Sequence, residues 1–368
     1  MPSFILQNDY ENLRKKVDEL KQQLTERCSQ LDVNVKQVFN EFFKEVLIRA
    51  VHESNWQEGI ELNEGRTQEL SNAAFDDLEE IQGPHLDMNK VLRFHRDIVI
   101  KLKREKKSEE EIATYNLAKA YQSLGWICSD LTSRQGTSIV QALLALKTEY
   151  EKHEHQLSPE ARASFENAME KVRIAREDVT PVSSPLTSLS ANAGERVNEL
   201  LKLDPDSLQH PMKPDYIQFL HKLVLMGILP MKKCGKYRTT SVHVGNPDVY
   251  FPVPSAVPSL MKEYCRQFPA IFPGAIKYDP IMAAAIVSHR FVAIHPYADG
   301  NGRVSRLLMN LVLWDHFPPV YLKADKKGRH RYSQAIRRAD RGNLKPLAAL
   351  IALSIIEIYE KMLNALKS

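Results

Sequence analysis

The sequence predicts a protein built almost entirely from α-helices, and three observations lead to this prediction. Apolar residues recur at helical spacing over long parts of the chain, most clearly over residues 10–55 and 92–151. Apolar runs also flank a short glycine-rich segment, 295–306, on both sides, which is the pattern of a helix, a tight turn and a second helix. Alternating polarity over residues 239–245 is followed by Asn-Pro, so a short β-hairpin is expected among the helices.

The first helical region carries an apolar seam at heptad spacing, with charged residues between its members. The seam consists of Leu13, Val17, Leu20 and Leu24. We expect it to pack on the rest of its own chain, because a sustained coiled coil needs more heptads. A short coiled coil that forms a homodimer contact is the alternative.

A segment rich in proline and serine, 180–190, is the clearest linker in the chain. It predicts two regions, an N-terminal helical region over 1–182 and a second helical domain over 191–368. The chain is long enough, and at 43% hydrophobic residues apolar enough, for both regions to bury a core.

Composition and charge argue against several classes of function. The net charge of +4 is too small to indicate nucleic-acid binding, and no apolar run is long enough to span a bilayer. The four cysteines are far apart and form no Cys-x-x-Cys pair, so neither a zinc site nor a disulfide framework is expected. Since the N-terminus also lacks a signal-peptide pattern, the sequence predicts a cytoplasmic protein with no membrane partner.

The segment His295-Pro-Tyr-Ala-Asp-Gly-Asn-Gly-Arg-Val-Ser-Arg306 carries the predicted chemistry. A turn at the start of a helix leaves backbone N–H groups unpaired beside the positive end of the helix dipole, so it binds phosphate. Asp299 can hold Mg²⁺, which takes one or two carboxylates and completes its shell with water and phosphate oxygens. Arg303 and Arg306 share a helix face and can clamp a polyphosphate, while neutral His295 can take a proton from an attacking hydroxyl.

The alternative for this segment is a basic interhelical loop with a structural histidine. It leaves the coincidence of an imidazole, a carboxylate, two glycines and two arginines unexplained, so we favour the functional interpretation. No Gly-x-x-x-x-Gly-Lys-(Ser/Thr) run occurs in the chain, which argues against a P-loop NTPase.

The same segment resembles the signature of the Fic family, His-Pro-Phe-x-(Asp/Glu)-Gly-Asn-Gly-Arg-x-x-Arg, with Tyr297 where phenylalanine is usual. The resemblance implies the Fic fold and, since Gly302 and Arg303 are kept, transfer of AMP from ATP to a Tyr, Ser or Thr hydroxyl of a target protein (AMPylation). It implies Mg²⁺ as the metal, His295 as the base and Asp299 as the metal ligand. The residues implied to bind the nucleotide phosphates are Gly300, Asn301, Gly302, Arg303 and Arg306.

Two further segments extend the resemblance. Fic proteins carry a β-hairpin flap that aligns the target segment as an added strand. The residues implied to form this flap are Val242, His243 and Val244. A hairpin with only a structural role is the alternative. The stretch 332–342 is similar to the family helix beside the adenine pocket, which implies that Tyr332 binds the nucleotide; the family often has asparagine where this chain has Asp340.

A short motif nearer the N-terminus is similar to the inhibitory pattern of Fic proteins, (Ser/Thr)-x-x-x-Glu-(Gly/Asn). It is formed here by Ser54, Glu58 and Gly59. In such proteins an N-terminal helix places the glutamate against the second arginine of the signature, which here is Arg306. Ser54 and Glu58 are four residues apart and therefore share one helical face.

The sequence therefore predicts an adenylyltransferase that uses ATP and Mg²⁺, acts on a target protein and is inhibited by Glu58. One alternative is a deAMPylase in which Glu58 activates water to remove AMP. Another, from a different class, is a nucleotide-binding regulatory or adaptor protein.

Overall fold

The computed structural model describes residues 10–76, 87–128, 212–242, 249–267, 279–314 and 316–367. The regular secondary structure in these residues is helical, which confirms the predicted all-α class. The helices are α1 (Tyr10–Gln30), α2 (Val35–Gln57), α3 (Glu64–Asp76), α4 (Met88–Arg104), a helical segment over 109–128, α8 (Pro214–Leu225), the 3-10 turn η4 (Pro254–Ala256), α9 (Val257–Gln267), α10 (Pro280–Ile294), α11 (Asn301–Leu313), α12 (Lys326–Ala339) and α13 (Lys345–Ala365).

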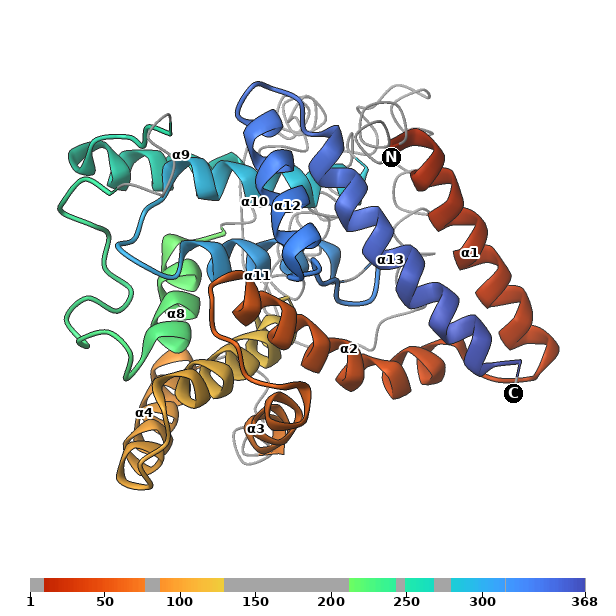
Figure 1. The fold of residues 1–368 in the computed structure, drawn as a ribbon, viewed down its shortest axis with the longest axis horizontal. Helices are drawn as coiled ribbons and strands as arrows, with labels where there is room; N and C mark the ends of the chain where they lie inside the picture. The colour runs from red at the N-terminus through yellow and green to blue at the C-terminus, as the bar shows by residue number, and fades with distance from the viewer. Residues whose placement is uncertain are drawn as a thin grey trace, which may run out of the picture. The chain divides into compact units, whose positions relative to one another are not determined.

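Helix α11 lies at the centre of the described core. It packs on α10, on α8 and on the end of α2, while α10 and α12 both pack on α13 (Figure 1). All the residues of α11 are buried except Gly302, which is half-buried, so this helix is enclosed on every side. The glycine-rich segment 295–306 therefore includes the N-terminus of a buried helix.

Helix α1 runs beside α13 in the same direction (Figure 1). Lys345 pairs with Glu11 near the start of both helices, and Arg27 donates to the carbonyl of Leu366 near their ends. The seam residues Val17, Leu20 and Leu24 are buried in α1. The seam is therefore used within the chain, as predicted, and the homodimer itself stays a prediction.

The described residues up to 128 and from 212 onward belong to one compact unit. The N-terminal helices α1 and α2 thus pack directly on the helices that carry the signature segment. The predicted linker and the boundary between 182 and 191 lie outside the described residues. None of the helices described is both long and apolar enough to cross a membrane.

The pair formed by α4 and segment 109–128 satisfies backbone carbonyls at the C-terminal end of α8. His95 Nε2 lies 3.3 Å from the carbonyl of Leu223, and Asn116 Nδ2 donates to the carbonyls of Val224 and Met226. These carbonyls have no partner within a helix that ends at Leu225, so the side chains replace missing backbone bonds. These hydrogen bonds fix the C-terminal end of α8. The same helix contacts residues 295–300, which we call the signature loop.

Candidate active site

The signature loop begins and ends in left-handed backbone conformations. His295 caps α10 with φ 50°, and Gly300 precedes α11 with φ 77°. A Cβ atom at residue 300 would lie 2.9 Å from Leu225 Cδ2, so both the backbone angle and the packing require glycine here. The six residues between the helices therefore form a tight turn, as the sequence predicts.

Asn301 closes this turn with its side chain. Its Oδ1 accepts a hydrogen bond from Tyr297 N at 3.0 Å, and its Nδ2 donates to Tyr297 O at 2.8 Å. The side chain that was expected to cradle phosphates is thus occupied within the loop and buried. What it does in this structure is hold the backbone N–H groups at the start of α11 in place.

His221 of α8, which the sequence analysis did not single out, holds the same loop from the other side. Its Nδ1 accepts from Gly235 N at 2.7 Å, so Nε2 carries the proton and donates to the carbonyl of Asp299 at 3.1 Å. Burial lowers the pKa of His221 to about 4, so the ring is neutral. It also stacks on Tyr297, with the ring centroids 3.8 Å apart. Tyr297 is fully buried.

Arg238 is a second residue that the sequence analysis missed. Its Nε donates to the carbonyl of His295 at 2.8 Å, and its two terminal nitrogens donate to the carbonyls of Thr240 and Pro252. The backbone N–H of Arg238 also donates to the carbonyl of Pro296. One buried guanidinium thus ties residues on both sides of the predicted flap to the signature loop.

The flap itself is described only in part. Residues 239–242 and 249–253 have no strand conformation, and Val242 is half-buried. His243 and Val244 lie outside the described residues, so the hairpin and its role stay predictions.

His295 lies on the ring of Phe251, with centroids 4.2 Å apart. Burial lowers the pKa of His295, and the nearby charge of Arg238 lowers it further, while the Val292 carbonyl and Glu58 oppose the shift. The imidazole is therefore neutral near pH 7, which is the form that can accept a proton.

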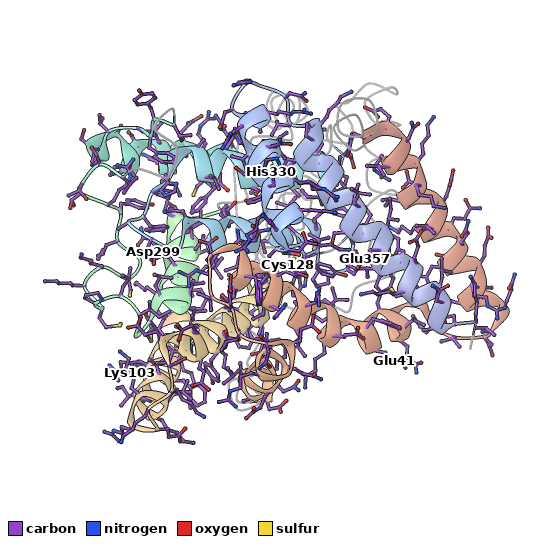
Figure 2. All side chains as sticks on the ribbon, viewed as in Figure 1. Glu41, Lys103, Cys128, Asp299, His330 and Glu357 are labelled. Carbon is purple, nitrogen blue, oxygen red and sulfur yellow. The ribbon has the colours of Figure 1, made fainter. Side chains whose placement is uncertain are left out.

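Arg303 and Asp299 line a cavity of about 220 Å³ together with Glu58. Arg303 is 4% exposed, and neither its Nε nor its Nη1 has a hydrogen-bond partner. Buried N–H groups without partners are rare, and on a guanidinium they suit an anion such as phosphate. Asp299 is 49% exposed and lies at the N-terminal end of α11 (Figure 2), where its Oδ1 accepts from Gly300 N.

Arg306 is 2% exposed and faces the end of α2. Its Nε donates to Ser54 Oγ at 2.7 Å, and its Nη2 donates to the Ser54 carbonyl at 2.9 Å and to Glu58 Oε1 at 2.6 Å. The structure therefore brings together the three residues whose association was expected from the two motifs. Gly302 permits this approach, because a Cβ atom at that position would overlap the Glu58 carboxylate.

The charges of this cluster support one another. Burial raises the pKa of Glu58, but Arg306 and Arg303 outweigh it and keep this pKa below its ordinary value. Burial likewise lowers the pKa of Arg306, and Glu58 more than reverses the effect. The carboxylate and the guanidinium are both charged at neutral pH and form a desolvated ion pair.

The turn after α2 delivers Glu58 to this position. Gly59 has φ 79°, and Ile60 N donates back to the carbonyl of Asn55 at 3.0 Å, which is a left-handed helix end of the common glycine type. The glycine of the motif is thus explained by its positive φ angle, which glycine adopts without strain.

The predicted nucleotide helix is α12. Burial raises the pKa of Tyr332 and the nearby charge of Arg306 opposes this rise, so the phenol lies beside the arginine that holds Glu58. Asp340, which follows α12, accepts from His289 Nε2 at 2.8 Å.

A neutral histidine thus lies beside the start of a buried helix, and Arg303, whose Nε and Nη1 have no hydrogen-bond partner, lines the adjoining cavity. Residues 211–313 match the model of the Fic/DOC family, so this part of the chain is similar to that family.

Two proteins named as Fic adenylyltransferases are similar to this chain in sequence. The chain is 33% identical over 156 residues to the protein adenylyltransferase fic-1 of Caenorhabditis elegans, which covers 42% of this chain and 29% of the relative. It is 34% identical over 134 residues to the protein adenylyltransferase Fic of Aedes aegypti, which covers 36% of this chain and 26% of that protein. The chain thus spans less than a third of the length of these relatives. A solved structure of Fic-1 from C. elegans is 19% identical, with a TM-score of 0.37, over 88% of this chain and 99% of that one.

Proposed function

We propose that this protein is an adenylyltransferase that transfers AMP from ATP to a Tyr, Ser or Thr hydroxyl of a target protein. The observation that carries the proposal is the buried Arg303 with unpaired N–H groups, next to neutral His295 at the start of α11. Relatives named protein adenylyltransferase support the same reaction.

In the proposed reaction His295 accepts the proton of the target hydroxyl. The hydroxyl oxygen forms a bond to the α-phosphorus of ATP, the bond from that phosphorus to the bridging oxygen breaks, and pyrophosphate leaves with the electron pair. Arg303 and the N–H groups of the loop bind the phosphate oxygens, and Arg306 binds the terminal phosphate once it is free. Positioning and neutralisation of charge provide most of the catalysis in such a transfer.

Asp299 fits the expected magnesium ion. It is half-exposed, borders the cavity that Arg303 lines, and stands as a single carboxylate, which is a common protein contribution when phosphates supply other ligands. The described residues contain no cluster of three or more metal-binding side chains, so this metal would depend on the nucleotide. When bound, Mg²⁺ would neutralise charge on the phosphates.

We further propose that Glu58 inhibits the transfer by occupying Arg306. The ion pair is desolvated, Ser54 satisfies two further N–H groups of the guanidinium, and Glu58 lines the cavity in which phosphate would lie. Removing one partner of such a pair leaves a buried charge, so the inhibited state is well held.

The test is incubation with labelled ATP and Mg²⁺, in the presence of cell lysate. We expect self-labelling or target labelling that disappears with His295→Ala and rises with Glu58→Gly. Labelling that persists with His295→Ala would contradict the role of the base. Labelling that is unchanged with Glu58→Gly, but needs His295, would contradict inhibition and leave the transferase.

Removal of AMP is a second candidate, because the charge of ionised Glu58 acts on His295 and the same carboxylate borders the cavity. Release of label from a modified target, lost with Glu58→Ala, would favour it. Binding of ATP without transfer or removal under any condition would favour the adaptor alternative.

We place the protein in the cytoplasm. The support is that Cys28, Cys128, Cys234 and Cys265 are all buried as thiols, which suits a reducing compartment. Cell fractionation would test this placement, and we expect the protein in the cytoplasmic fraction. The native protein should also resist crosslinking by oxidants.

A further inference from the structure

The end of α2 presents two neighbouring faces, and each is held by a different part of the chain. Ser54 and Glu58 are four residues apart and share the face that contacts Arg306. Glu53 and Gln57 are also four residues apart and share the next face, which contacts the segment 322–324 before α12. The second face belongs to no motif in the sequence.

Glu53 makes the strongest contact on that face. Its Oε2 accepts from the backbone N–H of Ala324 at 2.7 Å, and its Oε1 pairs with Arg49 at 2.5 Å. Both carboxylate oxygens of Glu53 thus have a partner. Because the side chain is also only 6% exposed, its position is fixed. Gln57 adds a hydrogen bond from its Nε2 to the carbonyl of Lys323 at 3.0 Å. We call these contacts of Glu53 and Gln57 the α2 latch.

The segment that receives the latch leads directly into the predicted nucleotide helix. Ala324 precedes Asp325, the N-cap of α12, and Asp325 accepts from Gly328 N. Arg329, in the first turns of α12, donates to the carbonyl of Trp56 in α2 at 3.3 Å. The end of α2 is therefore bound to α12 on one side and to Arg306 of α11 on the other.

We propose that Glu53, together with Gln57, positions the inhibitory glutamate by holding the end of α2 at the depth where Glu58 reaches Arg306. This inference rests on the proposed inhibition by Glu58. Because the latch ends on the entry to α12, movement of that entry when nucleotide or target binds is a route by which Glu58 leaves Arg306. Glu53 acts through Glu58 and has no contact with the nucleotide site of its own.

The test compares labelling rates at limiting ATP for Glu53→Ala, Glu53→Gln and a control, Glu41→Ala. Glu41 is exposed on the same helix, near its other end (Figure 2), and accepts a hydrogen bond from Gln37 within α2. We expect Glu53→Ala to raise labelling about tenfold, which corresponds to the loss of one charge-assisted hydrogen bond. Glu53→Gln keeps an acceptor for Ala324 N and should retain most of the inhibition, and Glu41→Ala should match the unmodified protein.

A second comparison separates positioning from a general loss of structure. In a Glu58→Gly background, Glu53→Ala should add nothing, because the group that it positions is gone. An equal increase in both backgrounds, or labelling by Glu53→Ala at the unmodified level, would overturn the inference. If Glu53→Ala does not fold, as judged by its thermal transition, Gln57→Ala tests the same latch, and unmodified labelling there would overturn it. Absence of labelling in Glu58→Gly itself would instead overturn the proposed function and the inference with it.

Discussion

Acidification is expected to destabilise the fold through the histidine that holds the signature loop. Burial lowers the pKa of His221 from 6.5 to about 4, although the hydrogen bond from its Nε2 to the Asp299 carbonyl opposes the shift. Its Nδ1 accepts from Gly235 N and is therefore unprotonated in the folded chain. The unfolded chain therefore binds more protons than the folded chain between these two values. Stability is fully present above pH 6.5 and is lost as the pH falls toward 4.

The size of the effect follows from the linkage relation. One pKa unit corresponds to about 1.4 kcal/mol, so His221 alone accounts for about 2 kcal/mol of lost stability between about pH 7.5 and about pH 5. His95 has its pKa lowered to about 4 by burial as well, and contributes a similar amount. Together the two histidines should remove about 4 kcal/mol from the free energy of unfolding over this range.

The assay is urea unfolding followed by circular dichroism at the two pH values, for the unmodified protein and for His221→Gln. Glutamine cannot be protonated in this range and keeps a donor in place of Nε2. We expect the variant to be less stable at neutral pH, where the acceptor for Gly235 N is lost, but to lose about 2 kcal/mol less of its stability between the two pH values. If the free energy of unfolding depends on pH identically in both proteins, His221 is not the neutral ring with two hydrogen bonds that we assign.

Three further predictions concern the loop, the inhibitory turn and the metal. Arg238→Lys should lower the free energy of unfolding by about 2–4 kcal/mol in urea melts and reduce labelling at least about tenfold, since one ammonium cannot bridge three carbonyls. Gly59→Ala should raise labelling a few-fold, because φ 79° costs alanine about 1 kcal/mol while its Cβ would meet nothing within 4 Å; an unchanged rate would show that the turn tolerates the strain. Asp299→Asn should raise the Mg²⁺ concentration for half-maximal labelling without changing the melting temperature, and an unchanged requirement would place the metal elsewhere.

The sequence was informative where the structure depends on neighbouring residues. Helical periodicity predicted the all-α class, and the glycines of 295–306 predicted the turn, because φ 77° at Gly300 is a local requirement. The contact that Ser54 and Glu58 make together could be anticipated because their spacing puts both on one helix face. Which residue lies opposite that face came from the resemblance to the Fic family, and local physics did not supply it.

The roles of several buried polar residues were decided only by the tertiary structure. Asn301 was expected to bind phosphate, yet its amide closes the loop on Tyr297. His221 and Arg238 were missed, because a histidine in an apolar helix or an arginine before a hairpin has no distinctive spacing. Their partners lie 78 and 57 residues away in the sequence.

Sequence alone thus determined the helical class, where the glycine-rich turn lies and which charged groups it carries, since each depends on residues close together in the chain. The tertiary structure decided how the loop is held, that Arg303 is left with unpaired N–H groups, and how Glu53 and Glu58 fix the end of α2. The physical reason is burial. Whether a polar group is satisfied, and whether its charge is retained, depends on which distant segments exclude water from it.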